Sequence, residues 1–231
     1  MNKLYRSYLM SWNVKGLNNV IKRKKILSFI RAKNCQIVFI QETHLSLLES
    51  YRLGAGRVGF VGAGCGSSNR GVAILIDRRL QFKCLKQSMD KEGRMLLMLC
   101  EIQGYNILAN VYAPNEITPL LYTTITPIPK THIALKGMCK ACCLADVWRL
   151  QNPSGRDYTF YSPPHQSLSI IDIFLVSKPI MTAVASTSIG SMILSDHSPI
   201  YLFMFAINTT VRSPRWRLNS SLLLDEAFKD S

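Results

Sequence analysis

Short apolar runs that stop abruptly at polar residues are the feature that most restricts the fold of this chain. They are rich in β-branched and aliphatic residues and are bounded by turn residues, a pattern typical of buried strands. The runs lie at residues 8–17, 36–43, 71–77, 94–104, 105–114, 156–163, 169–177 and 198–207. Strands therefore dominate, and the three consecutive runs from 71 to 114 predict an antiparallel sheet.

Two segments have the apolar spacing of helices, at residues 18–34 and 133–150. With the strands, they predict a two-layered β-sandwich flanked by helices. The Gly-rich segment 52–71 has the composition of a phosphate-cradling loop, but it lacks a Gly-x-Gly-x-x-Gly motif between a strand and a helix. We expect its glycines to serve turns and bulges.

Size and charge suggest one domain with an anionic partner. The chain has 231 residues, 48% of them hydrophobic, which is enough for one core. Lys and Arg number 28 and Asp and Glu 14, which gives a net charge of +14. Such an excess indicates nucleic acid or a membrane surface as partner, unless it forms only a solvated face.

The cysteines and the hydropathy pattern indicate an intracellular protein. Seven Cys at irregular spacing lie mostly in apolar runs, which predicts reduced, buried thiols. The cluster "CKACC" at 139–143 has no second Cys or His pair at zinc-finger spacing, so we expect no zinc. We also expect no signal peptide, no membrane span and no obligate protein partner, and the nucleus is one compartment open to the chain.

Oxygen and nitrogen donors gather where the apolar runs end. They are Asn13, Glu42, Tyr112, Asn115, Asp172, Asp196 and His197. A carboxylate beside a buried strand is costly unless it is paired or binds a metal, and for each acid alone a structural salt bridge is the alternative. Amide and carboxylate oxygens suit Mg²⁺ or Mn²⁺, and a histidine beside them could activate water or orient a phosphate.

Six ordered motifs resemble those of the endonuclease/exonuclease/phosphatase superfamily, which includes exonuclease III and apurinic endonucleases. They are "SWNVKGL", "IVFIQETHL", "NVYAPN", "YTFYSPPH", "IIDIFLVS" and "SDHSPI". The likeness is closest to the endonuclease domain of LINE-type retrotransposons. It implies a four-layered α/β sandwich over residues 1–207 that cuts DNA with one Mg²⁺, or Mn²⁺. The basic tail 208–231 is similar to the connector that follows this domain in such elements.

The resemblance also assigns roles to residues, motif by motif. Asn13, Glu42 and Asp196 match metal-site residues, while Tyr112, Asp172 and His197 match catalytic residues that hold the phosphate or orient the histidine. Asn115, Thr159 and Ser195 match residues that shape the surroundings or contact the substrate.

One family motif is missing from the sequence. A strand ending in Gly-Asp-Phe-Asn, whose Asp and Asn activate water and stabilise the transition state, is expected after "NVYAPN". Residues 116–132 hold a single acid, Glu116, and three prolines, so they leave no room for a helix and a central strand. We therefore expect a deletion around 116–132.

Two function classes follow from these observations. The first is a Mg²⁺-dependent nuclease of the exonuclease III or apurinic endonuclease type, acting on DNA and impaired in catalysis. The second is a non-catalytic retrotransposon remnant that at most binds nucleic acid. The basic charge disfavours a third class, a phosphoesterase acting on a small or lipid phosphate.

Overall fold

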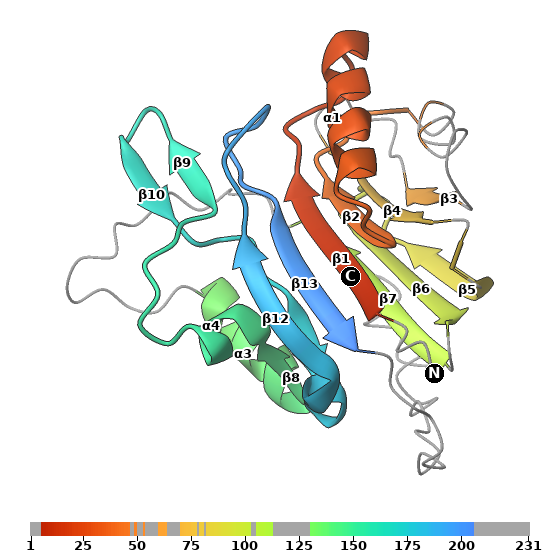
Figure 1. Ribbon diagram of the computed structural model, residues 1–231, viewed down its shortest axis with the longest axis vertical. Helices are drawn as coiled ribbons and strands as arrows, with labels where there is room; N and C mark the ends of the chain where they lie inside the picture. Colours follow the sequence, from red (N-terminus) through yellow and green to blue (C-terminus); the bar gives the residue numbers. More distant parts are fainter. Residues whose placement is uncertain are drawn as a thin grey trace.

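The computed structural model of the chain shows two sheet layers with helices outside them (Figure 1). This is the four-layered α/β sandwich expected from the sequence, so the predicted fold class is confirmed. The described residues are 6–46, 49, 53, 60–63, 70–77, 79–80, 82–102, 105–112 and 130–205.

Among these residues the largest sheet has six strands. In spatial order they are β12 (Val184–Ile189), β13 (Ile200–Phe205), β1 (Arg6–Asn13), β2 (Ile37–Gln41), β4 (Val72–Ile76) and β3 (Phe60–Ala63). Strands β1 and β2 are parallel, and every other neighbouring pair is antiparallel. Central strands β2 and β4 are buried along their whole length, as expected for continuous apolar runs that are covered on both faces.

Helix α1 (Val20–Ala32) covers one face of this sheet (Figure 1). The side chain of Asn19 accepts the backbone N–H groups of Ile21 and Lys22, so it caps the helix. Ile26 and Ile30, four residues apart on the helix, are buried against the sheet. The helix expected at 18–34 is thus confirmed, although Val20 and Ile21 of its apolar pattern are exposed.

The second layer packs on the opposite face of the large sheet. It contains the sheet β5 (Lys83–Met89), β6 (Met95–Glu101) and β7 (Tyr105–Val111), and the pair β8 (Leu144–Asp146) and β11 (Leu175–Ser177). Alternate residues of β2 separate the two cores: Val38 and Ile40 face α1, whereas Ile37 and Phe39 meet the second layer.

Within the described residues, the second layer is divided into two sheets. Strand β7 pairs with β6, and β8 pairs with β11, but no ladder joins the two pairs. Residues 113–129, which hold most of the expected deletion, lie outside the described residues, as does the tail 208–231.

The other described elements lie between residues 130 and 183. They are α3 (Lys130–Ala141), α4 (Val147–Gln151), the hairpin of β9 (Phe160–Ser162) and β10 (Ser167–Ser169), and the 3-10 helix η1 (Lys178–Ala183). Figure 1 shows the hairpin as a separate ribbon beside the large sheet.

Tertiary pairing overrides several local patterns. The single helix expected at 133–150 is interrupted, because Cys143 has a left-handed φ of 51° and residues Leu144–Asp146 pair with β11. The strand expected at 169–177 is confined to its last three residues. Strands β5 and β12 were not expected from the sequence, because their residues are largely exposed or polar and give no apolar signal.

The cysteines are less buried than expected. Cys35 and Cys100 are buried, but Cys84, Cys142 and Cys143 are exposed, and none of the described cysteines is in a disulfide. No described helix is long and apolar enough to span a membrane.

Candidate active site

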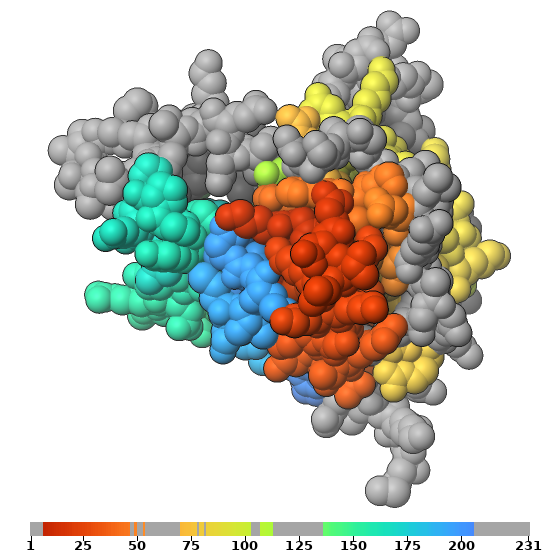
Figure 2. Space-filling view, turned by 90° about the horizontal axis from the view of Figure 1, so that it is seen from above, coloured from red at the N-terminus to blue at the C-terminus, as the bar shows by residue number. Residues whose placement is uncertain are grey.

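The expected donors come together because β1 and β2 continue to pair beyond their ends. The backbone N–H groups of Val14, Gly16 and Leu17 donate to the carbonyls of Gln41, Glu42 and Thr43, at 3.1, 2.7 and 2.9 Å. The two loops that follow parallel neighbouring strands are therefore joined side by side. In Figure 2, the N-terminal part of the chain (red) lies directly against the C-terminal part of the described chain (blue).

Asn13 and Glu42 form the first pair of the site. Asn13 ends β1 and is 4% exposed, and its Nδ2 donates to Glu42 Oε1 at 2.8 Å. The other carboxylate oxygen, Oε2, lies 3.4 Å from His44 Nε2. Asn13 Oδ1 accepts the backbone N–H of Lys15 at 3.1 Å. Both carboxylate oxygens of Glu42 therefore face a neighbouring nitrogen.

Ser195 and Asp196 connect the loop before β13 to Asn13. Ser195 Oγ lies 2.8 Å from the carbonyl of Asn13, to which it donates, and 3.4 Å from Asp196 Oδ1. The other oxygen of Asp196, Oδ2, accepts from Lys15 Nζ at 2.6 Å. The Asp196 side chain is 16% exposed and that of Lys15 is 58% exposed, so the lysine is the solvent-facing member of this ion pair.

His197 and Asp172 form the second pair of the site. His197 Nδ1 lies 2.8 Å from Asp172 Oδ2, and the imidazole packs against the ring of Phe160 at 4.6 Å between centroids. The carbonyl of His197 accepts from Trp12 Nε1 at 2.9 Å. With Nδ1 held by the carboxylate, Nε2 is the nitrogen left for a substrate.

Thr159 fixes the backbone at Asp172. Thr159 is fully buried, and its Oγ1 accepts the backbone N–H groups of Ile171 and Asp172 at 3.0 and 3.1 Å. Residues Ile171 and Asp172 lie outside the strands, and these two bonds tie their backbone to Thr159. Thr159 thus supports the backbone of Asp172, which fits the first of its two expected roles, shaping the surroundings of the site; a contact of Thr159 with substrate stays a prediction.

Lys22 is a second cation near the site. Its Nζ donates to the carbonyl of Lys15 at 2.9 Å. Partial burial lowers the pKa of Lys22, and the charge of Lys15 acts in the same direction, while Asp196 and Glu42 oppose the shift.

The loops of the site carry unusual backbone conformations. Lys15, Glu42, His44 and Leu194 have left-handed φ values of 47°, 51°, 53° and 60°. Such conformations cost non-glycine residues of order 1 kcal/mol each, and they persist where the surrounding structure enforces them. Gly16 has a φ of 86°, and a Cβ there would lie 2.8 Å from His44 Nδ1, so only glycine allows the imidazole to pack closely.

The amide and carboxylate oxygens of the site suit a hard cation that keeps some of its coordination positions for water or substrate. Within the described part of the chain, no three His, Cys, Asp or Glu side chains are clustered to hold a metal ion by themselves. Asn13, Glu42 and Asp196 instead offer an amide and two carboxylates, linked through Asn13. Mg²⁺ commonly binds one or two carboxylates and keeps waters and substrate phosphate as its other ligands.

Tyr112 and Asn115 are the remaining residues expected in the site. Tyr112 directly follows β7, its N–H donates to the carbonyl of Arg94 at 2.7 Å, and its half-buried side chain packs against the core between the sheets. Asn115 lies outside the described residues. Their roles stay predictions.

Sequence reasoning missed two residues in the same motifs. His44 stands two positions after Glu42 and faces its carboxylate. Asn110, the first residue of "NVYAPN", is 2% exposed and joins the two sheets: its Nδ2 donates to the carbonyls of Ile40 and Ala73, and its Oδ1 accepts from Gln41 Nε2. An amide inside an apolar strand was the available signal for Asn110.

Comparisons with known proteins identify the family and the fold of the chain. Residues 10–125 match the sequence profile described as the Endonuclease/Exonuclease/phosphatase family. The chain is 29% identical over 262 residues to the Transposon TX1 uncharacterized 149 kDa protein of Xenopus laevis, with 95% of this chain and 20% of that protein covered. The chain thus spans about a fifth of that relative's length.

Three solved structures illustrate the fold. The AP endonuclease LMAP from Leishmania major has a TM-score of 0.69 at 17% identity, with 87% of this chain and 88% of that chain covered. The 3′ phosphatase NExo from Neisseria, bound to a product DNA hairpin, gives 0.67 at 17% identity (87% and 100% covered). An AP endonuclease from Archaeoglobus fulgidus gives 0.65 at 16% identity (87% and 100% covered). At these identities the likeness concerns the fold.

Proposed function

Because the chain belongs to the endonuclease/exonuclease/phosphatase family, we propose that it is a retrotransposon-derived, DNA-directed phosphodiesterase domain that binds Mg²⁺ or Mn²⁺ and a backbone phosphate, with an impaired hydrolytic step. The convergence of Asn13, Glu42, Asp196 and the His197–Asp172 pair carries this proposal. These residues come from loops up to 184 positions apart in the chain, and the backbone bonds described above hold the loops together.

Each residue has a distinct part in phosphate binding. Asn13, Glu42 and Asp196 would hold the cation, which neutralises charge on the phosphate when it is bound. Asp172 accepts from His197 Nδ1 and so orients the imidazole, which leaves Nε2 to face a phosphate oxygen. Thr159 fixes the backbone of Asp172, and Ser195 joins the loop that carries Asp196 to the carbonyl of Asn13.

The hydrolytic step is the part that the chain is missing. Attack on a phosphodiester requires a group that removes a proton from water, and losing a general base costs roughly 10²–10⁴ in rate. The acids described around the site are already committed: Asp172 to His197, Asp196 to Lys15, and Glu42 to Asn13. The division of the second layer supports the loss of the strand that would carry the base.

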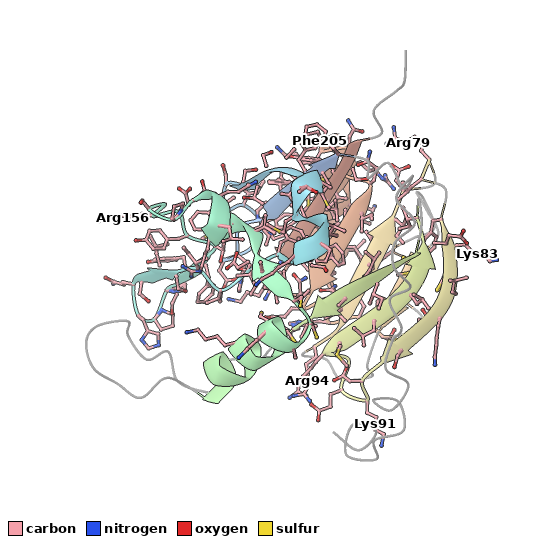
Figure 3. All side chains as sticks on the ribbon, turned by 90° about the horizontal axis from the view of Figure 1, so that it is seen from below. Arg79, Lys83, Lys91, Arg94, Arg156 and Phe205 are labelled. Atoms are coloured by element: carbon pink, nitrogen blue, oxygen red, sulfur yellow. The ribbon has the colours of Figure 1, made fainter. Side chains whose placement is uncertain are left out.

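DNA binding at this site must be separated from the effect of general charge. Basic side chains are spread over the molecule: Figure 3 shows Arg156 and Lys83 on opposite sides of the view. A net charge of +14 alone gives salt-dependent binding to any polyanion. The informative quantity is therefore the gain in DNA affinity that a divalent cation produces.

Fluorescence anisotropy with a short labelled DNA duplex tests the proposal at constant ionic strength. Adding Mn²⁺ should raise the DNA affinity of the parent chain several-fold, and Glu42→Gln should abolish this gain. Glu101→Gln, which removes the same charge from an exposed position on β6, should keep it. Equal responses of the parent and Glu42→Gln would refute the proposed site, and only nonspecific charge would remain.

A further inference from the structure

The ion pair between Lys15 and Asp196 places a cation of the protein on one of the residues assigned to the metal. Lys15 Nζ lies 2.6 Å from Asp196 Oδ2, on the side of the carboxylate that Ser195 does not contact. An ammonium group in this position competes with a divalent ion for the same oxygen. The divalent ion can bind Asp196 Oδ2 only if the ammonium group of Lys15 moves away or shares this oxygen with the ion.

The structure makes Asp196 the fixed partner and Lys15 the movable one. The Asp196 side chain is only 16% exposed, and the backbone carbonyl of Asp196 accepts the N–H of Tyr161 at 3.0 Å. The Lys15 side chain is 58% exposed, and an exposed ion pair of this kind contributes only about 0–1 kcal/mol. A phosphate oxygen that arrives from solvent can therefore take the ammonium group at little cost.

The backbone of Lys15 remains in the site when its side chain moves. The N–H of Lys15 donates to Asn13 Oδ1, and its carbonyl accepts from Lys22 Nζ. Both anchors hold the start of the side chain beside the metal-site residues. The flexible four-carbon stem of lysine then lets the ammonium group turn from the carboxylate to a phosphate bound next to it.

We propose that Lys15 is a phosphate-binding residue that moves from Asp196 to the DNA backbone on binding, so that DNA and the divalent cation bind cooperatively. The inference rests on the proposed function, because it takes Asp196 as a metal ligand and DNA as substrate. Removing the ammonium group frees Asp196 Oδ2 for the cation and removes a like charge. The same change also removes one contact to phosphate. The two affinities therefore change in opposite directions.

Lys15→Gln provides the test, with Mn²⁺ and a short DNA duplex as probes. Free Mn²⁺ is measured by electron paramagnetic resonance, with and without the duplex. In the absence of DNA, Lys15→Gln should bind Mn²⁺ about three- to tenfold more tightly than the parent, which corresponds to about 0.6–1.4 kcal/mol. DNA should tighten Mn²⁺ binding in the parent, and this gain should shrink in the variant. Affinity for the duplex should fall.

Matched variants identify the cause of any change. Lys25→Gln removes the same charge from an exposed position on α1 and should leave Mn²⁺ binding unchanged. Lys15→Arg keeps the charge and should keep the coupling to DNA. Thermal melts establish that each variant folds.

The outcomes separate the inference from the proposed function. If Glu42→Gln loses Mn²⁺ binding but Lys15→Gln binds it as the parent does, the competition by Lys15 is refuted and the metal site stands. If neither the parent nor Lys15→Gln binds Mn²⁺ in a Glu42-dependent way, both are refuted. Tighter Mn²⁺ binding in Lys15→Gln, together with weaker DNA binding, supports the inference.

Discussion

Replacing Asn110 with alanine should loosen the contact between the two sheets of the sandwich. Asn110 belongs to β7 in the second layer, but its Nδ2 donates to two carbonyls of the large sheet, Ile40 and Ala73, at 2.9 and 2.8 Å. Its Oδ1 accepts from Gln41 Nε2 at 2.6 Å. The amide is therefore a polar link between layers that otherwise meet through apolar side chains.

The size of the effect follows from these three hydrogen bonds. Each contributes about 1 kcal/mol net, and the groups left behind are buried. Gln41 keeps its bond to Ser11 Oγ at 3.0 Å, which offsets part of the loss. We expect Asn110→Ala to lower the free energy of unfolding by about 2–3 kcal/mol, and Tm by roughly 4–12 °C for a chain of this size.

Urea unfolding followed by circular dichroism measures this change, with Asn18→Ala as the control. Asn18 is exposed in the loop before α1, so its replacement should change stability by less than about 0.5 kcal/mol. If Asn110→Ala is as stable as the control, the amide does not link the sheets, and our account of the interface is wrong.

Three further outcomes are expected elsewhere in the molecule. Thr159→Val keeps the shape of the side chain but removes the acceptor for two N–H groups, so it should destabilise the chain by about 1–3 kcal/mol. It should also weaken Mn²⁺-dependent DNA binding, because the backbone of Asp172 loses its support; unchanged DNA binding would contradict this role. His44→Gln should reduce Mn²⁺ affinity several-fold in titrations, because the carboxylate of Glu42 loses the imidazole that lies beside it. An affinity equal to that of the parent would show that His44 has no part in the metal site. Iodoacetamide at pH 8 should label exposed Cys142 well before Cys100, whose pKa is raised by burial to about 11, as mass spectrometry would show; equal rates would refute the burial of Cys100.

The sequence predicts the parts of the fold that rest on local apolar patterns. Strands β2 and β4 and helix α1 lie where continuous or helically spaced apolar residues indicate them, since burial on both faces or on one face leaves that signal. Strand β12 gives no such signal, because its alternate residues are small or polar and partly exposed. Helix α3 ends before position 150 because Leu144–Asp146 pair with a distant strand.

The sequence predicts which residues belong to the site but not which of them contact one another. Asn13 and Glu42 follow buried strands, where polar residues are visible in the sequence. The ion pair of Lys15 with Asp196 joins residues 181 positions apart, and no local pattern contains it. Asp172 was expected at a strand end, but hydrogen bonds from a separate segment, at Thr159, place it in a loop.

The most direct test of the central claim is a nicking assay on supercoiled plasmid with Mg²⁺. In the proposed function, this chain keeps the metal- and phosphate-binding residues but is missing the group that activates water. The chain should therefore show little or no turnover, and insertion of the Gly-Asp-Phe-Asn segment of a related element in place of residues 116–132 should restore nicking that depends on Glu42. Efficient nicking by the chain as it stands, abolished by Glu42→Ala, would contradict the claim and show that another group serves as the base.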